Sequence, residues 1–302
     1  MNFYLDTMII SNLAKPGGAS LQANLLSFLA KKNAKLAISF HHIGEIVAID
    51  SGTRTYGTSV LYLPLEIGKM LDRCPINELD GGPAVVDVEF REAYAADAQN
   101  RPPKQISPPG WGEWKGPPPV KGKRSVSDTI ARIHDKDRRG DARIRFKAIA
   151  DQNAAFRATR KAEYESGKER KPLSLEAAID MERAALRQSI FKTNSCWPPS
   201  GLYLTPQAEQ ARRRQFLDRL NFPTCSALNL FGVLMAHHHF HLGSQHVNAG
   251  GLSDPWHAAI GCHYADRFVT EDKALYRALV DVKPLAPYPA DVFTSLSAAL
   301  AD

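Results

Sequence analysis

The sequence predicts an α/β fold built around a mainly parallel sheet. Short apolar runs with the length of buried strands, Phe3 to Leu5 and Leu36 to Ile38, are each followed by a run with helical spacing. A chain that alternates strands with helices forms a mainly parallel sheet, because each helix carries the chain back to where the next strand starts. The contents of 44% hydrophobic and 23% charged residues are those of a protein with a buried core.

Apolar spacing places the remaining elements. Leucines recur every four residues from Leu21 to Leu29, as on a helix that faces a core. Thr205 and Pro206 have the character of a helix cap and first turn, and the apolar stretch from Leu228 to Met235 predicts a buried helix. Four further elements are expected: a helix around Ile43 to Val47, a helix opened by Asp254 and Pro255, a strand from Arg267 to Thr270 and a last strand from Val282 to Leu285.

The middle of the chain is basic. Residues 1–100 and 221–302 each have a net charge of −3, whereas residues 101–220 carry 26 Lys and Arg against 14 Asp and Glu, a net charge of +12. This asymmetry favours a polyanionic partner, with a merely solvated basic surface as the alternative. Residues 101–120 hold seven prolines, which indicates a loop, and residues 126–192 have a helix-forming composition.

Membrane and secreted classes are disfavoured. No apolar run approaches the roughly 20 residues that cross a bilayer, so we expect no membrane association. The N-terminus lacks the basic stretch and apolar core of a signal peptide, which favours a cytoplasmic location. The four cysteines form no C-x-x-C pair, so free thiols are expected rather than a disulfide framework or a zinc site.

Acidic residues follow the predicted strands. Asp6 comes directly after the first strand, Glu45 lies near the start of the helix after the second, and Asp272 follows a late strand. The carboxyl ends of parallel strands converge at one edge of a sheet, so these acids are expected to meet there, with Asp254 as a fourth. Four carboxylates repel one another unless a cation lies between them, and oxygen ligands suit Mg²⁺ or Mn²⁺. The pattern therefore predicts a divalent-metal site.

Each acid also has a purely structural explanation. Asp6, Asp254 and Asp272 all stand where a helix is expected to begin, and aspartate is a good N-cap residue. Glu45 is compatible with a solvent-facing position. His257, three residues after Asp254 on the same helix face, is within reach of the pocket, where a packing or supporting role suits it better than general-base catalysis.

Four stretches carry a likeness to a known family. They run from Phe3 to Ser11, from Ile38 to Ile46, from Ser253 to Ala259 and from Ala265 to Lys273. In these motifs and in their order the chain resembles the PIN-domain family of metal-dependent ribonucleases. The resemblance covers about residues 1–75 and 222–302, a credible size for one domain.

The resemblance implies a PIN-like three-layer fold with a central parallel sheet, formed by residues 1–75 and 222–302. Residues 76–221 would then be a basic, mostly helical insertion with the Pro-rich loop at 101–120. By the same resemblance, one or two Mg²⁺ or Mn²⁺ ions would orient a hydroxide against a backbone phosphate, with Thr7 and Thr270 in support. The residues implied as metal ligands are Asp6, Glu45, Asp254 and Asp272.

Two departures from the family pattern limit what carries over. Met8 stands where the family commonly has asparagine, so a polar contact is missing or is supplied elsewhere. The insertion is far longer than the one or two helices found at this place in compact relatives, so the substrate rules of small PIN toxins transfer poorly.

The sequence thus predicts a metal-dependent endoribonuclease whose basic insertion holds the substrate. The residues expected to bind it are Arg138, Arg139, Arg212, Arg213 and Arg214. RNA is favoured over DNA, and an antitoxin-like protein partner and a homodimer are compatible with the resemblance. Two alternatives stay open: a non-catalytic nucleic-acid-binding protein on a PIN scaffold, and a structure-specific DNA nuclease.

Overall fold

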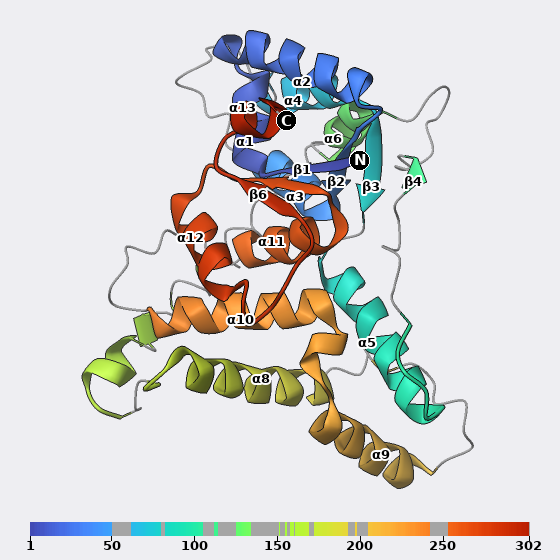
Figure 1. Ribbon diagram of the computed structural model, residues 1–302, viewed down its shortest axis with the longest axis vertical. Helices are drawn as coiled ribbons and strands as arrows, with labels where there is room; N and C mark the ends of the chain where they lie inside the picture. Colours follow the sequence, from blue (N-terminus) through green and yellow to red (C-terminus); the bar gives the residue numbers. More distant parts are fainter. Residues whose placement is uncertain are drawn as a thin grey trace.

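A computed structural model gives the fold of the chain. It describes residues 1–49, 62–79, 82–104, 112–113, 125–133, 161–168, 172–192, 205–241 and 253–301, together with positions 151, 155, 158–159 and 197. The expected α/β class is confirmed, with a six-stranded sheet and helices packed around it (Figure 1). Within these ranges, no helix combines the length and the apolar character needed to span a membrane.

The sheet has the strand order β4-β3-β2-β1-β5-β6. Its strands are β1 (Asn2–Leu5), β2 (Lys35–Ser39), β3 (Ile76–Leu79), β4 (Gly112–Glu113), β5 (Arg267–Val269) and β6 (Asp291–Phe293). All neighbouring pairs are parallel except β3 and β4, which are antiparallel. The chain runs outward from β1 to β3 and later returns to the other side of β1, so the strand order reverses at β1.

The central strand β1 is buried on both faces, because Phe3, Tyr4 and Leu5 are all 0% exposed. Successive side chains of a strand point to opposite faces, so Phe3 and Leu5 enter one core while Tyr4 enters the other. Helices cover the first face: α1 (Thr7–Ala14), α2 (Ala19–Lys31), α3 (Phe40–Ala48), α4 (Tyr62–Leu71), α6 (Val126–Ile133) and α13 (Leu296–Ala301). The second face packs against α10 (Ser226–Phe240), α11 (Ser253–Tyr264) and α12 (Lys273–Val282).

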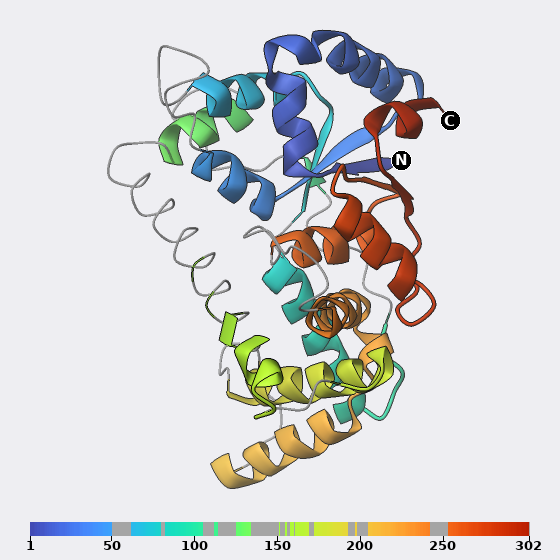
Figure 2. The ribbon, with the colours of Figure 1, turned by 90° about the vertical axis from the view of Figure 1, so that its left-hand side faces the viewer.

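Three more helices form a helical layer that begins beside α10 and extends away from the sheet (Figure 2). They are α5 (Gly82–Ala98), α8 (Leu175–Lys192) and α9 (Pro206–Arg219), and single 3-10 turns lie at Pro16–Gly18 and Phe222–Thr224. The core of this layer is aromatic, with Phe90, Tyr94, Trp197 and Phe216 packed edge to face. Thus the part of residues 76–221 that is described here is largely helical.

A buried carboxylate joins this layer to the sheet side. Glu89 of α5 is 5% exposed and accepts hydrogen bonds from the backbone N–H groups of Ala227 and Leu228, at the start of α10. It also accepts one from the hydroxyl of Tyr264, 2.6 Å away at the end of α11. Burial raises the pKa of Glu89. Capping α10 in this way offsets part of the cost of burying the group.

The sheet does not end at residue 75, where the sequence pattern weakens. Strand β3 pairs with β2, and Val126 and Ile130 of α6 enter the core of the first face. The carboxylate of Asp72 caps α6 by accepting from the backbone N–H groups of Val126 and Ser127. Only Ile76 and Leu79 of the four β3 residues are apolar, which explains why the apolar pattern gave no strand there.

Most other elements agree with their sequence prediction, and one does not. Thr205 caps α9 through its hydroxyl, which accepts from the backbone N–H of Ala208, as expected. The strand predicted from Val282 to Leu285 is wrong, because α12 continues to Val282. The buried residues of α12 recur at helical spacing, with Leu275 and Leu279 before Val282, and the last strand is β6 instead.

Helix α11 packs unusually close to the sheet at Gly261. A Cβ atom there would lie 2.6 Å from the Phe268 ring and 2.9 Å from the Tyr4 ring, closer than packed carbon atoms come. The absence of a side chain at Gly261 therefore allows α11 to lie this close to β1 and β5.

We predict that Gly261→Ala lowers the free energy of unfolding by about 1–3 kcal/mol, because overpacking outweighs the gain in helix propensity. Gly17→Ala is the control, since a Cβ atom there meets nothing within 4 Å. Chemical denaturation of both variants measures the difference. Equal stability of the two variants would contradict the close approach.

Candidate functional site

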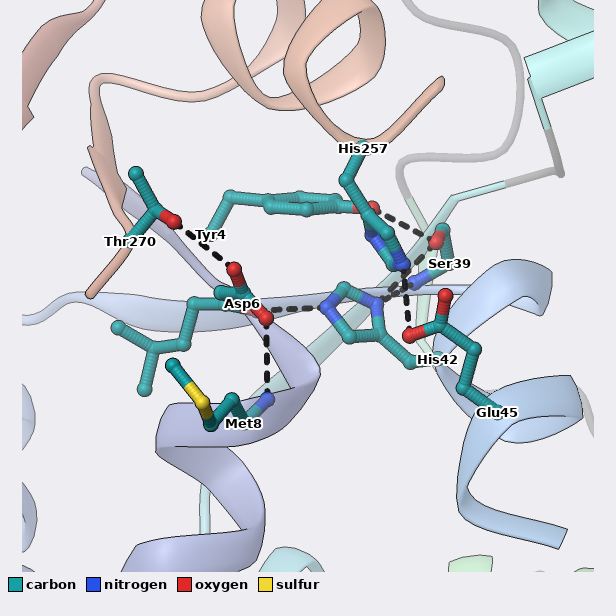
Figure 3. A network of polar contacts seen from close by, with 9 residues as sticks. Tyr4, Asp6, Met8, Ser39, His42, Glu45, His257 and Thr270 are labelled. Atoms are coloured by element: carbon teal, nitrogen blue, oxygen red, sulfur yellow. Dashed lines mark hydrogen bonds and ion pairs between the residues drawn. The ribbon is translucent and has the colours of Figure 1, made fainter. Parts of the chain in front are cut away.

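The candidate site lies at the carboxyl ends of β2, β1 and β5, which are neighbouring parallel strands. In open parallel sheets, ligands bind beyond the carboxyl ends of the strands, at the point where the strand order reverses. Asp6 follows β1, Glu45 lies on α3 after β2, and Thr270 follows β5. His257, near the start of α11, faces the same edge (Figure 3). The structure thus brings these sequence-predicted residues to one place.

Asp6, Thr270 and Asp272 form one hydrogen-bonded unit. The Thr270 hydroxyl, which is 0% exposed, donates to Oδ2 of Asp6 at 2.8 Å. The same hydroxyl accepts from the backbone N–H of Asp272 at 3.1 Å. A threonine hydroxyl carries one proton and can also accept, so Thr270 orients the first carboxylate and the backbone of the second.

The two aspartates also cap helices, as their structural explanation predicts. Asp6 Oδ1 accepts from the backbone N–H of Met8 at the start of α1, and Asp272 Oδ1 accepts from those of Ala274 and Leu275 at the start of α12. Each cap uses one oxygen of the carboxylate, and an ionised carboxylate offers about four lone pairs. Capping and cation binding are therefore compatible in these residues.

Glu45 is turned toward α11 and not into solvent. Its Oε2 lies 3.0 Å from Nε2 of His257, and the side chains of these residues are 21% and 3% exposed. The contact has the distance of an ion pair without the alignment of a hydrogen bond. The solvent-facing alternative for Glu45 is therefore not what the structure has.

His42 anchors a buried polar network behind the acids (Figure 3). Its Nε2 lies 2.6 Å from the carbonyl oxygen of Leu5, and its Nδ1 lies 3.0 Å from the backbone nitrogen of Ser39. A carbonyl can only accept and a backbone N–H can only donate, so the proton of neutral His42 is on Nε2. Burial lowers the pKa of His42 to about 3, which keeps the ring neutral.

Tyr4 links this histidine to the acids. Its hydroxyl lies 2.8 Å from Oγ of Ser39 and 2.7 Å from Nδ1 of His257. Burial raises the pKa of Tyr4 well above its usual range, so the hydroxyl stays protonated. The network therefore runs from β1 and β2 through Tyr4 to His257 and Glu45.

Sequence reasoning did not single out Tyr4, Ser39 or His42. One signal for the last two was present, since Ser39 and His42 have the spacing of a capping box in which histidine replaces the usual Glu or Gln. Tyr4 gave no signal of its own, because its neighbours in a buried strand are also large and apolar. Its hydroxyl becomes informative only when the strand is known to be buried on both faces.

Two further predicted residues lie at the same edge. Helix α11 begins at Ser253, so Asp254 lies in its first turn, three residues before His257, although the side chain of Asp254 is outside the described residues. Thr7 is 7% exposed at the start of α1. Its buried hydroxyl oxygen has no hydrogen-bond partner within the described ranges.

The donor chemistry of the edge suits a hard divalent cation, because its acids offer only oxygen ligands. Among the side chains that the structure describes, however, no group of three or more His, Cys, Asp or Glu residues is arranged to hold a metal ion. The side chain of Asp254 is not among those described. The described acids form two pairs instead, Asp6 with Asp272 through Thr270, and Glu45 with His257.

The arginines of α9 lie at the end of the molecule opposite to the sheet (Figure 1, Figure 2). Arg213 lies over the Trp197 ring at 5.1 Å and pairs with Glu209 at 3.3 Å. Arg212 and Arg214 lie over the aromatic rings of Tyr94 and Phe191. These three side chains therefore contact the aromatic part of the helical layer, and the structure does not bring them to the acids. Arg138 and Arg139 lie outside the described residues.

The histidines at the end of α10 behave as parts of a helix terminus. His237 and His241 have ring centroids 4.4 Å apart, and His237 Nε2 lies 3.2 Å from Oδ2 of Asp281. His239 pairs with Glu182 of α8 at 3.2 Å. Burial lowers the pKa of His237.

Neither a scan against protein-family models nor searches of curated proteins and of solved structures find a match for this chain. The functional argument therefore rests on the geometry of the site and on the four motifs.

We predict that acid destabilises the protein through neutral histidines, one buried and one half-buried, that resist protonation. The pKa of His42 is about 3 and burial lowers that of His263 to about 4, both below the ordinary 6.5, so the unfolded chain binds these protons first as the pH falls. Stability is then full above pH 6.5 and falls toward pH 4 by about 1.4 kcal/mol per pH unit for each such group.

Urea denaturation at several pH values measures this slope in wild type and in His42→Gln. The variant should have a flatter dependence between pH 6.5 and 4, whatever its stability at neutral pH. His263→Gln provides a second, independent variant. Slopes equal to that of wild type in both variants would contradict the prediction.

Proposed function

We propose that the chain is a divalent-metal-dependent nuclease of the PIN-domain type that hydrolyses phosphodiester bonds in RNA. One observation carries the proposal. Asp6, Thr270 and Asp272 are joined by hydrogen bonds at the reversal of the strand order. Glu45 and the first turn of α11, which contains Asp254, lie at the same edge.

The arrangement of the elements supports this proposal. A mainly parallel sheet with helices on both faces is compatible with a three-layer PIN-like fold. In three of the four motifs that resemble the family, the acid comes after a strand of that sheet, and the fourth motif lies on α11. Acids from well-separated parts of the sequence lie at that edge, where open parallel sheets bind their ligands.

The residues that would hold one or two Mg²⁺ or Mn²⁺ ions are Asp6, Glu45, Asp254 and Asp272. When bound, such an ion would supply a Lewis acid for the phosphate and an activated water. The chain itself holds the acids: Thr270 and the N–H of Met8 fix both oxygens of Asp6, and His257 contacts Glu45. Thr7, the residue after Asp6, is 7% exposed, and the resemblance implies a supporting role for it.

The charge distribution supports a polyanionic substrate. An acidic cluster repels a phosphate backbone at long range, and the +12 charge of residues 101–220 offsets that repulsion. Arg212 to Arg214 contribute to this field from a distance and do not line the site. Three points stay predictions: RNA as the substrate, an antitoxin-like protein partner and a homodimer. The test below also distinguishes the two alternatives, a nucleic-acid-binding protein and a DNA nuclease.

We predict that the purified protein cleaves single-stranded or structured RNA with Mg²⁺ or Mn²⁺ and not in excess chelator. Asp6→Asn and Asp254→Asn should each lower the rate at least about 100-fold, because each removes a charge that holds the cation. The assay compares labelled RNA, single-stranded DNA and flap DNA.

Asp291→Asn is the matched control, because Asp291 is exposed at the start of β6, at the opposite edge of the sheet. It should cleave like wild type. Cleavage of DNA alone would favour the DNA-nuclease alternative. Metal-independent nucleic-acid binding without any cleavage would favour the binding protein.

The Thr270 hydroxyl gives a further prediction. Thr270→Val keeps the shape of the side chain but removes the hydrogen bond to Asp6, so cleavage should fall about 10- to 100-fold. Thr270→Ser retains the hydroxyl and should retain most of the activity. A valine variant as active as the serine variant would remove Thr270 from the machinery of the site.

A further inference from the structure

In the buried network behind the acids, the distances define which group donates and which accepts in each hydrogen bond. His42 donates from Nε2 to the carbonyl oxygen of Leu5, 2.6 Å away. Nδ1 of a neutral imidazole has one lone pair, and the backbone N–H of Ser39 donates to it at 3.0 Å. The hydroxyl oxygen of Ser39 lies 3.1 Å from the same Nδ1, whose lone pair is already used. The proton of that hydroxyl is therefore directed to its other neighbour, the oxygen of Tyr4 at 2.8 Å.

The same reasoning continues through Tyr4. Its oxygen accepts from Ser39, so its single proton goes to the remaining neighbour, Nδ1 of His257, 2.7 Å away. A neutral His257 that accepts at Nδ1 carries its proton on Nε2. That N–H lies beside Oε2 of Glu45, at 3.0 Å between the heavy atoms.

We propose that His257 is a positioning residue that presents an N–H to Glu45, and that Tyr4, Ser39 and His42 fix the tautomer in which it does so. The chain of donors starts at the sheet backbone and ends at the site. In this direction the hydroxyls of Ser39 and Tyr4 and the Nδ1 atoms of both histidines have partners while the rings are neutral, and Nε2–H of His257 lies 3.0 Å from Oε2 of Glu45. In the reverse direction, the N–H and the hydroxyl of Ser39 would both donate to the single lone pair on Nδ1 of His42. The lone pair on Nε2 of His257 would then face Oε2 of Glu45, which would require an imidazolium at His257 or a protonated Glu45.

Burial gives this arrangement its strength. Tyr4 and His42 are 0% exposed, Ser39 is 1% exposed and His257 is 2% exposed, so water does not compete for their hydrogen bonds. Tyr4 lies on β1, Ser39 at the end of β2 and His257 on α11, and all these segments are held by the sheet. In a low-dielectric interior hydrogen bonds are stronger than in water, so these side chains hold one another in place. The network therefore positions His257 of α11 against the carboxylate of Glu45 on α3.

The role of Glu45 in cleavage rests on the proposed function, whereas the direction of the network does not. Two measurements separate them. Long-range ¹⁵N–¹H NMR of the histidine rings in the metal-free protein reports which nitrogen carries the proton. Cleavage of labelled RNA at several Mg²⁺ concentrations reports kcat, KM and the metal dependence.

In wild type, His42 and His257 are both expected in the Nε2–H form. Tyr4→Phe removes the hydroxyl that donates to Nδ1 of His257 and keeps the aromatic ring. His257 should therefore shift to a mixture of the Nδ1–H and Nε2–H tautomers. Tyr288→Phe is the matched control. The hydroxyl of Tyr288 is also buried but donates to the carbonyl of Leu279. Ser39→Ala provides a second variant if Tyr4→Phe does not fold.

In the cleavage assay, Tyr4→Phe should lower kcat about 10- to 100-fold and require more Mg²⁺ for half-maximal rate, with KM for RNA little changed. His257→Gln, which keeps an N–H donor, should be less impaired than His257→Phe. An Nδ1–H form of His257 in wild type, or an unchanged tautomer in both Tyr4→Phe and Ser39→Ala, would overturn the proposal.

Kinetic parameters of Tyr4→Phe equal to those of wild type would also overturn the positioning role. If wild type cleaves no RNA with either metal, the proposed function fails, and the NMR measurement alone then decides whether the network has the direction inferred here.

Discussion

The hydroxyl of Tyr4 has no access to water, and much of the site follows from that constraint. A buried hydroxyl must be hydrogen-bonded within the protein, or its desolvation goes uncompensated. Here the partners come from a neighbouring strand and from α11, as Ser39 and His257. The ring beside that hydroxyl packs against Gly261, which brings α11 close enough for His257 to reach it. The close packing at Gly261 and the hydrogen bond between Tyr4 and His257 thus both fix the position of α11.

The sequence predicted the elements whose apolar spacing is strong. The runs at Phe3 to Leu5 and Leu36 to Ile38 are strands in which every one of these side chains is buried, so their pattern was unambiguous. The last strand was misplaced, because β6 begins with an exposed Asp291 and is only three residues long, while Val282 belongs to a helical face. Strand β3 was missed because polar residues interrupt it. Strands of three or four residues carry little periodicity from which to identify them.

The candidate site was predicted residue by residue and not as a network. Aspartates that cap helices at the ends of strands are visible in a sequence, which is why Asp6 and Asp272 were found and why two explanations fitted both. The pairing of Glu45 with His257 joins residues more than 200 positions apart, and only the fold brings them together. Net charge was informative about the middle of the chain but not about individual arginines. Arg213, for example, lies over Trp197 at a distance from the acids.

Helix α10 belongs to two cores at once. Leu230 and Val233 face the sheet side, while Leu228 packs into the aromatic core of the helical layer, and Glu89 of that layer caps the helix. Ten of the fifteen residues of α10 are buried. Separation of either the sheet side or the helical layer would therefore expose apolar surface of α10 to water. We therefore expect the sheet and the helical layer to unfold together, because a sheet domain without that layer would expose the side of α10 around Leu228.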